Sequence, residues 1–356
     1  MAHVGIVFGG RSVEHQVSIN SARTVARGLR EAGHRVTALG IAQDGCWIDT
    51  AAAAAVLAGD QRAIPPLGVP VAPTLAALLS SGVEVVFPIV HGSWGEDGTL
   101  QGLCEMLDLP YVGPGVTASA VAMDKLFSKQ LLAAAGLPLL PCETVGRGEF
   151  ERAPRAFLDR LERLPLPLFV KPRRGGSSIG VKRVADRVCA ETAVRFALRF
   201  DDAVLVERGV AGRELECAVL GYDTIIASAV GEIVPGNEFY DYADKYLQDT
   251  AGLHAPADLP PATADRLRAL AVAAFTALGG VGLARVDFLL EGEDGLFVNE
   301  VNTLPGFTAI SMYPRLWELS GVPLPQLVDR LVSIAQARHR DRRRLDDSIK
   351  SWLAEL

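Results

Sequence analysis

The segment from Leu283 to Gly306, LARVDFLLEGEDGLFVNEVNTLPG, constrains the fold more than any other part of the chain. Two runs of strand-forming residues flank a Gly-Glu-Asp-Gly turn, and this pattern predicts a β-hairpin. Symmetric pairing about the turn places Asp287 opposite Glu300 and Arg285 opposite Asn302, with all four side chains on one face. Two facing carboxylates repel each other, so the pairing favours a cation between them.

The donor types on this face indicate which cation to expect. Carboxylate and amide oxygens with no His or Cys nearby suit hard Mg²⁺ rather than zinc. The alternative interpretation is a solvated hairpin face on which Arg285 neutralises part of the acidic charge.

Composition narrows the class of protein. The chain has 356 residues, of which 49% are hydrophobic, and this is enough for two or three compact domains. A net charge of -7 argues against nucleic acid as a main partner and favours small molecules. Five scattered cysteines without a C-x-x-C pair indicate neither a disulfide framework nor a zinc site, which fits a reducing cytoplasm. No apolar run is long enough to span a membrane, and the N-terminus lacks a signal-peptide pattern.

The first part of the chain alternates between strand and helix patterns. Short apolar strands are expected at His3–Phe8, Arg35–Ile41 and Glu84–Val90, with a helix at Ser18–Glu31. Alternation of this kind predicts an α/β domain with a parallel sheet, which we place at residues 1–123.

The remaining chain predicts two further units, at residues 124–210 and 211–345, and a tail at 346–356. The residues from Ala337 onward are expected to form a solvated terminal helix or a frayed end. The other expected elements are a helix from Thr117 or Ser119 to Gly136, strands at Leu168–Lys171 and Ala203–Glu207, a helix near Cys189–Arg199, strands at Glu214–Leu220 and Ile225–Val230, and a helix at Ala262–Leu278.

A glycine-rich loop follows the strand that ends at Lys171. Its sequence, RRGGSSIG, lets backbone N–H groups close around an anion, and Lys171 adds a positive charge. The loop lacks the G-K-[ST] of a Walker A motif. A phosphate-binding loop and a plain hairpin turn are both compatible with this pattern.

Three other segments carry candidate functional groups. Val206–Val210 follows a strand and offers backbone and carboxylate groups to an adenine and ribose. The first glycine turn, before Glu14, lacks the spacing of a dinucleotide site. His91 follows a buried strand at the edge where α/β sheets bind ligands, so it is either a ligand-binding or a structural histidine.

Residues 232–256 have no helix or strand pattern, and a loop of this length inside a compact domain is usually functional. We expect a lid in which aromatic and cationic side chains cover a site. These side chains are Tyr240, Tyr242, Lys245 and Tyr246.

Six segments of the chain, taken in order, resemble the ATP-grasp ligases, and closely the D-alanine–D-alanine ligases. They are the glycine turn with Glu14 and the motifs HGSWGEDGT, VKPRRGGSSIGV, VERGVAGRE, FYDYADKY and RVDF…NEVNTLPG. The resemblance covers Val4 to Val332. It implies a three-domain ATP-grasp fold of mixed α/β and α+β class, with an N-terminal doubly wound parallel-sheet domain. It also implies ATP bound between the central and C-terminal domains, and a homodimer.

The resemblance further implies a role for each matching residue. ATP would be bound by Lys125, Lys171, Glu207, Gly209, Val210, Glu214, Lys245 and Asn299. Two Mg²⁺ ions, or Mn²⁺, would be held by Asp287, Glu300 and Asn302. The first D-alanine would bind Glu14 and His91, and the carboxylate of the second would bind Ser311 and Met312. Arg285 and the Gly306 N–H would stabilise the oxyanion, and Glu14, Ser177 and Tyr246 would link the closed lid.

The implied reaction is ATP-dependent ligation of two D-alanines through an acyl phosphate, for peptidoglycan precursor synthesis. Tyr246, Ser177 and the phosphate are all candidates for the group that removes the ammonium proton. Alternative functions are a D-alanyl-D-lactate or D-alanyl-D-serine ligase, and a non-catalytic ATP-binding module. Some relatives have Trp and Leu after the adenine-binding glutamate, where this chain has Arg208, Gly209 and Val210, so the resemblance leaves the shape of the purine pocket open.

Overall fold

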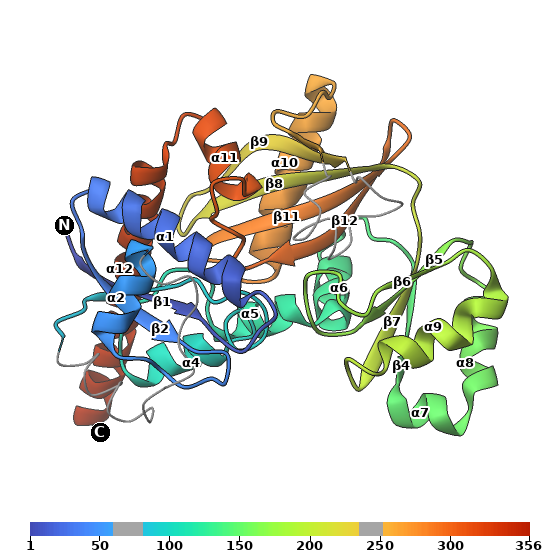
Figure 1. Ribbon diagram of the computed structural model, residues 1–356, viewed down its shortest axis with the longest axis horizontal. Coiled ribbons are helices and arrows are strands. Elements are labelled where there is room, and N and C mark those ends of the chain that lie inside the picture. Colours follow the sequence, from blue (N-terminus) through green and yellow to red (C-terminus); the bar gives the residue numbers. More distant parts are fainter. Residues whose placement is uncertain (60–80, 235–251) are drawn as a thin grey trace.

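The computed structural model describes residues 1–59, 81–234 and 252–356 (Figure 1). Within these residues the chain forms three sheets, which follow one another along the sequence. A three-stranded sheet lies at residues 3–88, a four-stranded sheet at 142–208 and a five-stranded sheet at 213–302. The domain boundaries at 123/124 and 210/211 stay a prediction.

The N-terminal sheet is parallel, as expected, with the strand order β2-β1-β3. Val4, Ile6 and Phe8 pack in the same core as helix α1, whereas Val7 packs with α4 on the opposite face. Helices therefore cover both faces of the sheet, and the domain is doubly wound. The elements are β1 (His3–Gly9), α1 (His15–Glu31), β2 (Arg35–Ile41), α2 (Thr50–Ala58), β3 (Val85–Pro88) and α4 (Thr99–Met106).

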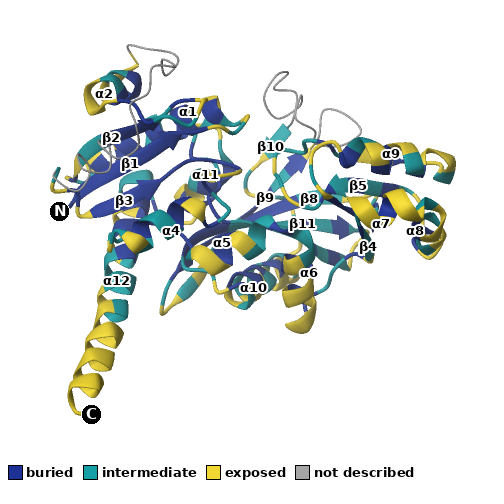
Figure 2. Cartoon of the chain, turned by 90° about the horizontal axis from the view of Figure 1, so that it is seen from below, coloured by how far each residue is buried: buried dark blue, intermediate teal, exposed yellow. Residues whose placement is uncertain are grey.

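The last helix, α12 (Leu324–Ala354), returns to the N-terminal domain and packs along α1. Gly28 permits this close approach, because a Cβ at that position would lie 2.9 Å from Leu324 Cγ. The expected division at 345/346 falls inside this helix, which continues without a break. Its distal part projects from the body of the protein and is exposed (Figure 2).

One expected helix is two helices in the structure. The prediction of a single helix up to Gly136 was wrong, because α5 (Val116–Met123) ends at Asp124 and α6 (Lys125–Ala134) begins directly after it. Asp124 has an extended backbone, and its carboxylate accepts hydrogen bonds from the N–H groups of Leu126 and Phe127. The same carboxylate receives the guanidinium of Arg173 at 2.8 Å. The break is therefore fixed by a cap and by a distant loop.

The central sheet has the order β4-β7-β5-β6 and is antiparallel. The predicted strands near 168 and 203 are confirmed, and the helix predicted near Cys189–Arg199 is present but shorter. Strand β4 was not expected, because only Val145 of its five residues is buried and alternation is weak. The elements are β4 (Cys142–Gly146), α7 (Arg147–Arg152), α8 (Pro154–Leu161), β5 (Leu168–Pro172), β6 (Lys182–Val184), the short 3₁₀ helix η1 (Arg187–Cys189), α9 (Ala190–Ala197) and β7 (Ala203–Arg208).

The C-terminal sheet has the order β10-β9-β8-β11-β12. Helix α10 covers one face, and the other face is lined with polar side chains. Residues 232–234 pair with residues 252–254, so the two ends of the expected lid are strands, contrary to prediction. The side chains expected to cover the site lie outside the described residues: Tyr240, Tyr242, Lys245 and Tyr246. The elements are β8 (Arg213–Gly221), β9 (Ile225–Val234), β10 (Gly252–His254), α10 (Pro261–Ala277), β11 (Gly282–Glu291), β12 (Gly295–Asn302) and α11 (Met312–Leu319).

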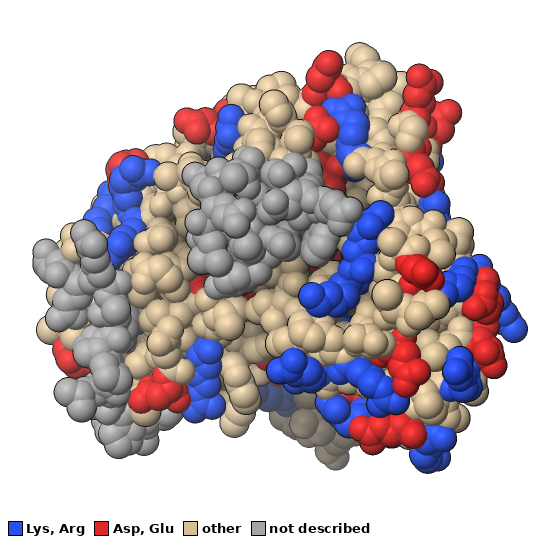
Figure 3. All heavy atoms as spheres, turned by 45° about the vertical axis from the view of Figure 1, so that its right-hand side comes forward, with Lys and Arg blue, Asp and Glu red and all other residues tan. Residues whose placement is uncertain are grey.

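Basic and acidic side chains are interspersed on the face drawn in Figure 3. None of the helices in the described parts of the chain is long and apolar enough to cross a bilayer. All five cysteines are free thiols.

Candidate active site

The β11–β12 hairpin has the predicted pairs at its functional end. Asp287 lies opposite Glu300 and Arg285 opposite Asn302, which confirms the expected register there. Near the turn the expected register was wrong by one residue, because Glu291 pairs with Gly295. A β-bulge beside Asp287 makes up the difference and leaves Asn299 as the extra residue. Asn299 and Glu300 therefore both line the same cleft, although they are adjacent in sequence.

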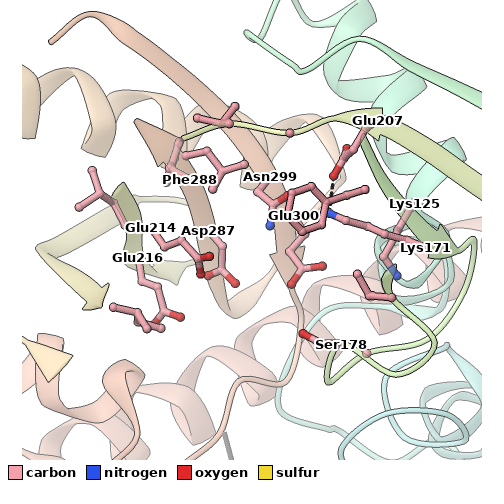
Figure 4. Close-up of a pocket in the computed structure, with 18 of the residues that line it drawn as sticks. Lys125, Lys171, Ser178, Glu207, Glu214, Glu216, Asp287, Phe288, Asn299 and Glu300 are labelled. Carbon is pink, nitrogen blue, oxygen red and sulfur yellow. Dashed lines mark ion pairs between the residues drawn. The ribbon is translucent and has the colours of Figure 1, made fainter. Parts of the chain in front are cut away.

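This cleft, of about 340 Å³, lies between the central and C-terminal sheets. Lys125, Lys171 and the Glu207 carboxylate lie at one end, whereas Glu214, Glu216 and Asp287 lie at the other, with Glu300 between them (Figure 4). The structure brings together eleven of the predicted site residues as its lining: Lys125, Lys171, Ser177, Glu207, Gly209, Val210, Glu214, Arg285, Asp287, Asn299 and Glu300.

Glu207 at the basic end is buried between two lysines. Its carboxylate forms ion pairs with Lys171 and, at 2.9 Å, with Lys129. Burial alone would raise the pKa of Glu207, but the two ammonium groups outweigh it and lower that pKa to about 2. The sequence analysis missed Lys129, although its spacing of four from Lys125 on α6 places both lysines on one helix face.

Lys125 connects α6 to the glycine-rich loop. Its Nζ donates to the Gly175 carbonyl at 2.6 Å, and burial lowers its pKa. The loop joins two antiparallel strands, β5 and β6, and so it is also a hairpin connection. Four of its residues have positive φ, a conformation that exposes backbone N–H groups to an anion: Gly175, Ser177, Ser178 and Gly180.

The acidic end contains three carboxylates on adjacent strands. Asp287 on β11 lies opposite Glu300 on β12 and opposite Glu216 on β8. Arg285 donates two hydrogen bonds to Asp287, at 2.6 and 2.7 Å, and its Nε lies 3.1 Å from Glu216. Burial opposes the charge on Arg285, but Asp287 and Glu216 raise its pKa well above the usual value. Glu216 was missed, although a charged residue alternating through the apolar strand ELECAVL marks a polar face.

The donor set fits a divalent cation completed by other ligands. No group of three or more His, Cys, Asp and Glu within the described ranges is arranged to hold a metal by itself. Two facing carboxylates and the Asn302 amide, which lies 2.8 Å from Asp287, provide oxygen donors on one side. Mg²⁺ is commonly bound in this way, by one or two carboxylates together with water and substrate phosphates.

A second cleft adjoins the first on the side of the N-terminal domain, and Glu14 lines it. The Ser177 hydroxyl donates to Glu14 Oε1 at 2.6 Å, which joins the glycine-rich loop to the start of α1. Gly92 leaves space for this carboxylate, since a Cβ there would lie 2.8 Å from Glu14 Oε2.

His91 is buried, and its ring contacts protein groups at both nitrogens. Nε2 lies 3.0 Å from Ser21 Oγ, and Nδ1 lies 2.9 Å from the Leu304 carbonyl and 3.6 Å from Glu96. Burial lowers the pKa of His91, but the Glu96 carboxylate outweighs it and the pKa is raised. Burial also raises the pKa of Glu96, to about 7. These contacts favour the structural interpretation of His91.

Gly306 and Ser311 lie on the connection between β12 and α11, and Met312 is the first residue of α11. Ser311 is the residue before the first turn of α11, and its hydroxyl accepts from the Thr308 N–H at 3.0 Å. The Met312 side chain is buried in the core against Gly231, so any contact with a ligand must come from its backbone.

Known proteins match this chain along nearly its whole length. Residues 3–114 match the family model "D-ala D-ala ligase N-terminus", and residues 131–333 match "D-ala D-ala ligase C-terminus". D-alanine–D-alanine ligases of Mycobacterium sp. (strain KMS) and Solibacter usitatus are 47% and 44% identical, covering 94% and 95% of this chain and 96% and 97% of theirs.

The chain belongs to the D-alanine–D-alanine ligase family. The solved D-alanine–D-alanine ligase of Coxiella burnetii is similar in structure, with a TM-score of 0.82 and 34% identity over 99% of both chains. The VanG D-Ala:D-Ser ligase of Enterococcus faecalis has a TM-score of 0.80 and 32% identity, covering 94% of this chain and 99% of its own. The fold is therefore the ATP-grasp fold, as expected. Ligases of this family depend on ATP and a divalent metal.

The sequence difference at Arg208, Gly209 and Val210 has a local structural explanation. Gly209 packs so closely that a Cβ would lie 2.9 Å from the Pro167 carbonyl oxygen and 3.0 Å from Phe169. Arg208 turns to the side and forms hydrogen bonds of 3.0 and 2.8 Å with Glu291. A larger residue at 209 requires a shift of the segment that holds Pro167.

Proposed function

We propose that this ligase joins two D-alanine molecules to D-alanyl-D-alanine, with conversion of ATP to ADP and phosphate, for synthesis of a peptidoglycan precursor. The observation that carries the proposal is the cleft in which Lys125 and Lys171 line the same space as the Asp287–Glu300 pair. Family membership supplies the substrate class.

The nucleotide would lie along this cleft. Lys125 and Lys171 would neutralise its phosphates, assisted by N–H groups of the glycine-rich loop. The purine and ribose would contact the wall of the cleft that the 206–210 segment and Glu214 form. These residues are Glu207, Gly209, Val210 and Glu214, with Asn299 nearby and Lys245 expected from the sequence.

Asp287, Glu300 and Asn302 would hold two Mg²⁺ ions, for which Mn²⁺ can substitute. Such ions offset the negative charge of a phosphoryl group during its transfer. Arg285 donates two hydrogen bonds to Asp287, which would fix its guanidinium beside these ions.

The two amino acids would bind at the boundary with the N-terminal domain. Glu14 would receive the ammonium group of the first D-alanine, and the N–H groups at the start of α11, beside Ser311 and Met312, would receive the carboxylate of the second. Phosphorylation turns the first carboxylate into an acyl donor, which the second amine then attacks. Arg285 and the Gly306 N–H would stabilise the resulting oxyanion.

The attacking ammonium must first lose a proton. Ser177 is one candidate acceptor, and its hydrogen bond to Glu14 gives the proton a carboxylate to move toward. Tyr246, which the sequence predicts as the third member of this link, and the phosphate are the other candidates. We also propose a homodimer in the cytoplasm, where ATP is available and the free cysteines stay reduced.

A substrate panel tests the function. Purified protein is given ATP, Mg²⁺ and single or paired D- and L-amino acids or D-lactate, and both ADP and the product mass are measured. We expect D-alanyl-D-alanine as the main product, including at pH 7 with equal D-alanine and D-lactate. Similarity to the D-Ala:D-Ser ligase makes D-alanyl-D-serine the second candidate. ADP release without any dipeptide would support an ATP-grasp enzyme that acts on other substrates, and ATP binding without ADP release would support a non-catalytic ATP-binding module.

A further inference from the structure

We propose that Ser21 and His91, in the N-terminal domain, are positioning residues that hold residues 303–311 between β12 and α11 (the Gly306 loop), and that His91 does not bind substrate. This inference rests on the proposed role of the Gly306 N–H as an oxyanion donor. It assigns Ser21, a residue with no other function in the site, to the same reaction.

Two anchors bracket Gly306. On its C-terminal side, the Phe307 N–H donates to Ser21 Oγ at 3.1 Å. On its N-terminal side, the Leu304 carbonyl lies 2.9 Å from His91 Nδ1. Ser21 and His91 are themselves joined at 3.0 Å, and both are buried. The N-terminal domain thus contacts the loop immediately before and after Pro305 and Gly306.

The direction of each hydrogen bond follows from the chemistry of the donors. A backbone N–H only donates, so the Phe307 N–H uses a lone pair of Ser21 Oγ. The Leu304 carbonyl only accepts, so His91 Nδ1 carries a proton and donates to it; in the neutral ring Nε2 then accepts from the Ser21 hydroxyl. Both ring nitrogens of His91 are engaged in this arrangement, and neither is left to contact a substrate.

The loop needs this support because its position decides where the Gly306 N–H points. Phe307 is buried beside the rings of Phe87 and Tyr313, at centroid distances of 6.1 and 5.3 Å. These apolar contacts hold the ring of Phe307 but do not set the rotation of the preceding peptide. Oxyanion donors act through preorganised geometry, and a misplacement of about 1 Å costs on the order of 100-fold in rate.

Ser21→Ala tests the inference, with Ser18→Ala as its matched control. Ser18 lies on the same helix, is equally buried, and also makes two hydrogen bonds, to the Gly9 N–H at 2.8 Å and the Ile89 carbonyl at 2.6 Å. Both substitutions remove one buried hydroxyl, so similar losses of thermal stability are expected. Only Ser21→Ala removes contact with the Gly306 loop.

We expect Ser21→Ala to lower kcat about 10- to 100-fold and to change KM for ATP and D-alanine by less than about threefold. A tetrahedral phosphinate analogue of the dipeptide should bind more weakly by a factor similar to the loss in kcat. Ser18→Ala should keep kcat within about threefold of wild type. Ser21→Thr, which keeps the hydroxyl, should recover part of the loss.

His91→Asn is the second variant, and it tests the inference even if Ser21→Ala fails to fold. Asparagine places an amide near the former Nδ1 and retains the contact with Leu304, so an intermediate kcat with unchanged KM is expected. An unchanged kcat in Ser21→Ala, or a loss in either variant confined to KM for D-alanine, would overturn the inference. Failure of wild-type protein to form any dipeptide would instead refute the proposed function.

Discussion

Asp287 on β11 lies directly opposite Glu300 on β12, and the hairpin changes register by one residue immediately beyond this pair. The bulge turns Asn299 toward the same cleft, so the consecutive residues Asn299 and Glu300 line it together with Asp287. Two carboxylates in direct opposition are stable only with positive charge between or beside them.

Glu300→Gln is therefore expected to abolish dipeptide synthesis, by at least about 100-fold, while the protein remains folded, because it removes one metal-binding charge. Steady-state ADP release and thermal unfolding measure the two effects. Glu293→Gln, in the exposed turn of the same hairpin, serves as control and should retain full activity. Near-wild-type ligation by folded Glu300→Gln protein would contradict the proposal that this face of the hairpin binds a metal ion.

Ser177 joins the glycine-rich loop to Glu14, and it does so from a residue with φ of +53°. Ser177→Ala loses the hydrogen bond to a carboxylate, which is worth roughly 1.5–3 kcal/mol, and kcat/KM for D-alanine should fall about 10- to 100-fold. Ser177→Gly should lose the same activity yet unfold at a higher temperature than Ser177→Ala, because glycine adopts positive φ without strain. Equal activity in all three proteins would show that the link has no role in catalysis.

Glu207 predicts a specific dependence of stability on acid. Its pKa of about 2 in the folded protein lies below the ordinary value of 4.5. Its contribution is therefore complete above pH 4.5 and is lost as the pH falls from 4.5 toward 2. We expect Glu207→Gln to lower the free energy of unfolding by about 3 kcal/mol at pH 7. The difference in this free energy between wild type and variant should shrink as the pH falls from 4.5 toward 2. Denaturant titration at several pH values measures this, with exposed Glu151→Gln as control; a difference independent of pH would contradict the assignment.

The two halves of α12 should differ in importance. Arg338 stacks 4.1 Å from the centre of the Tyr111 ring and donates to the Gly113 and Tyr111 carbonyls at 2.6 and 3.0 Å. Arg338→Ala should cost about 2–3 kcal/mol of stability, since it removes a buried stack and leaves two carbonyls without this donor.

A chain that ends at Arg344 provides the comparison for Arg338→Ala. The removed segment includes side chains that are 56–85% exposed: Leu345, Ile349, Trp352, Leu353 and Leu356. Its loss should change stability by less than about 0.5 kcal/mol and leave ligation unaffected. A large loss of stability on truncation would mean that the distal helix is covered by a partner.

The sequence by itself determined the hairpin pairing around Asp287, the parallel N-terminal sheet and the position of the glycine-rich loop. Each of these depends on local rules, namely the alternation of strand side chains, turn residues and helix periodicity. The order of the motifs also indicated the ligase family, and the similarity to known D-alanine–D-alanine ligases shows that family independently.

Only the tertiary structure decided which distant groups meet. The helix break at Asp124 depends on Arg173, the burial of Glu207 depends on Lys129, and the contacts of His91 depend on Ser21 and Leu304. Partners separated by up to 213 positions leave no periodic pattern in a single sequence. Interactions between these charges and hydrogen-bonding groups become strong only when folding removes the groups from water. The sequence therefore indicated His91 as a candidate residue but left open whether its role is structural or functional.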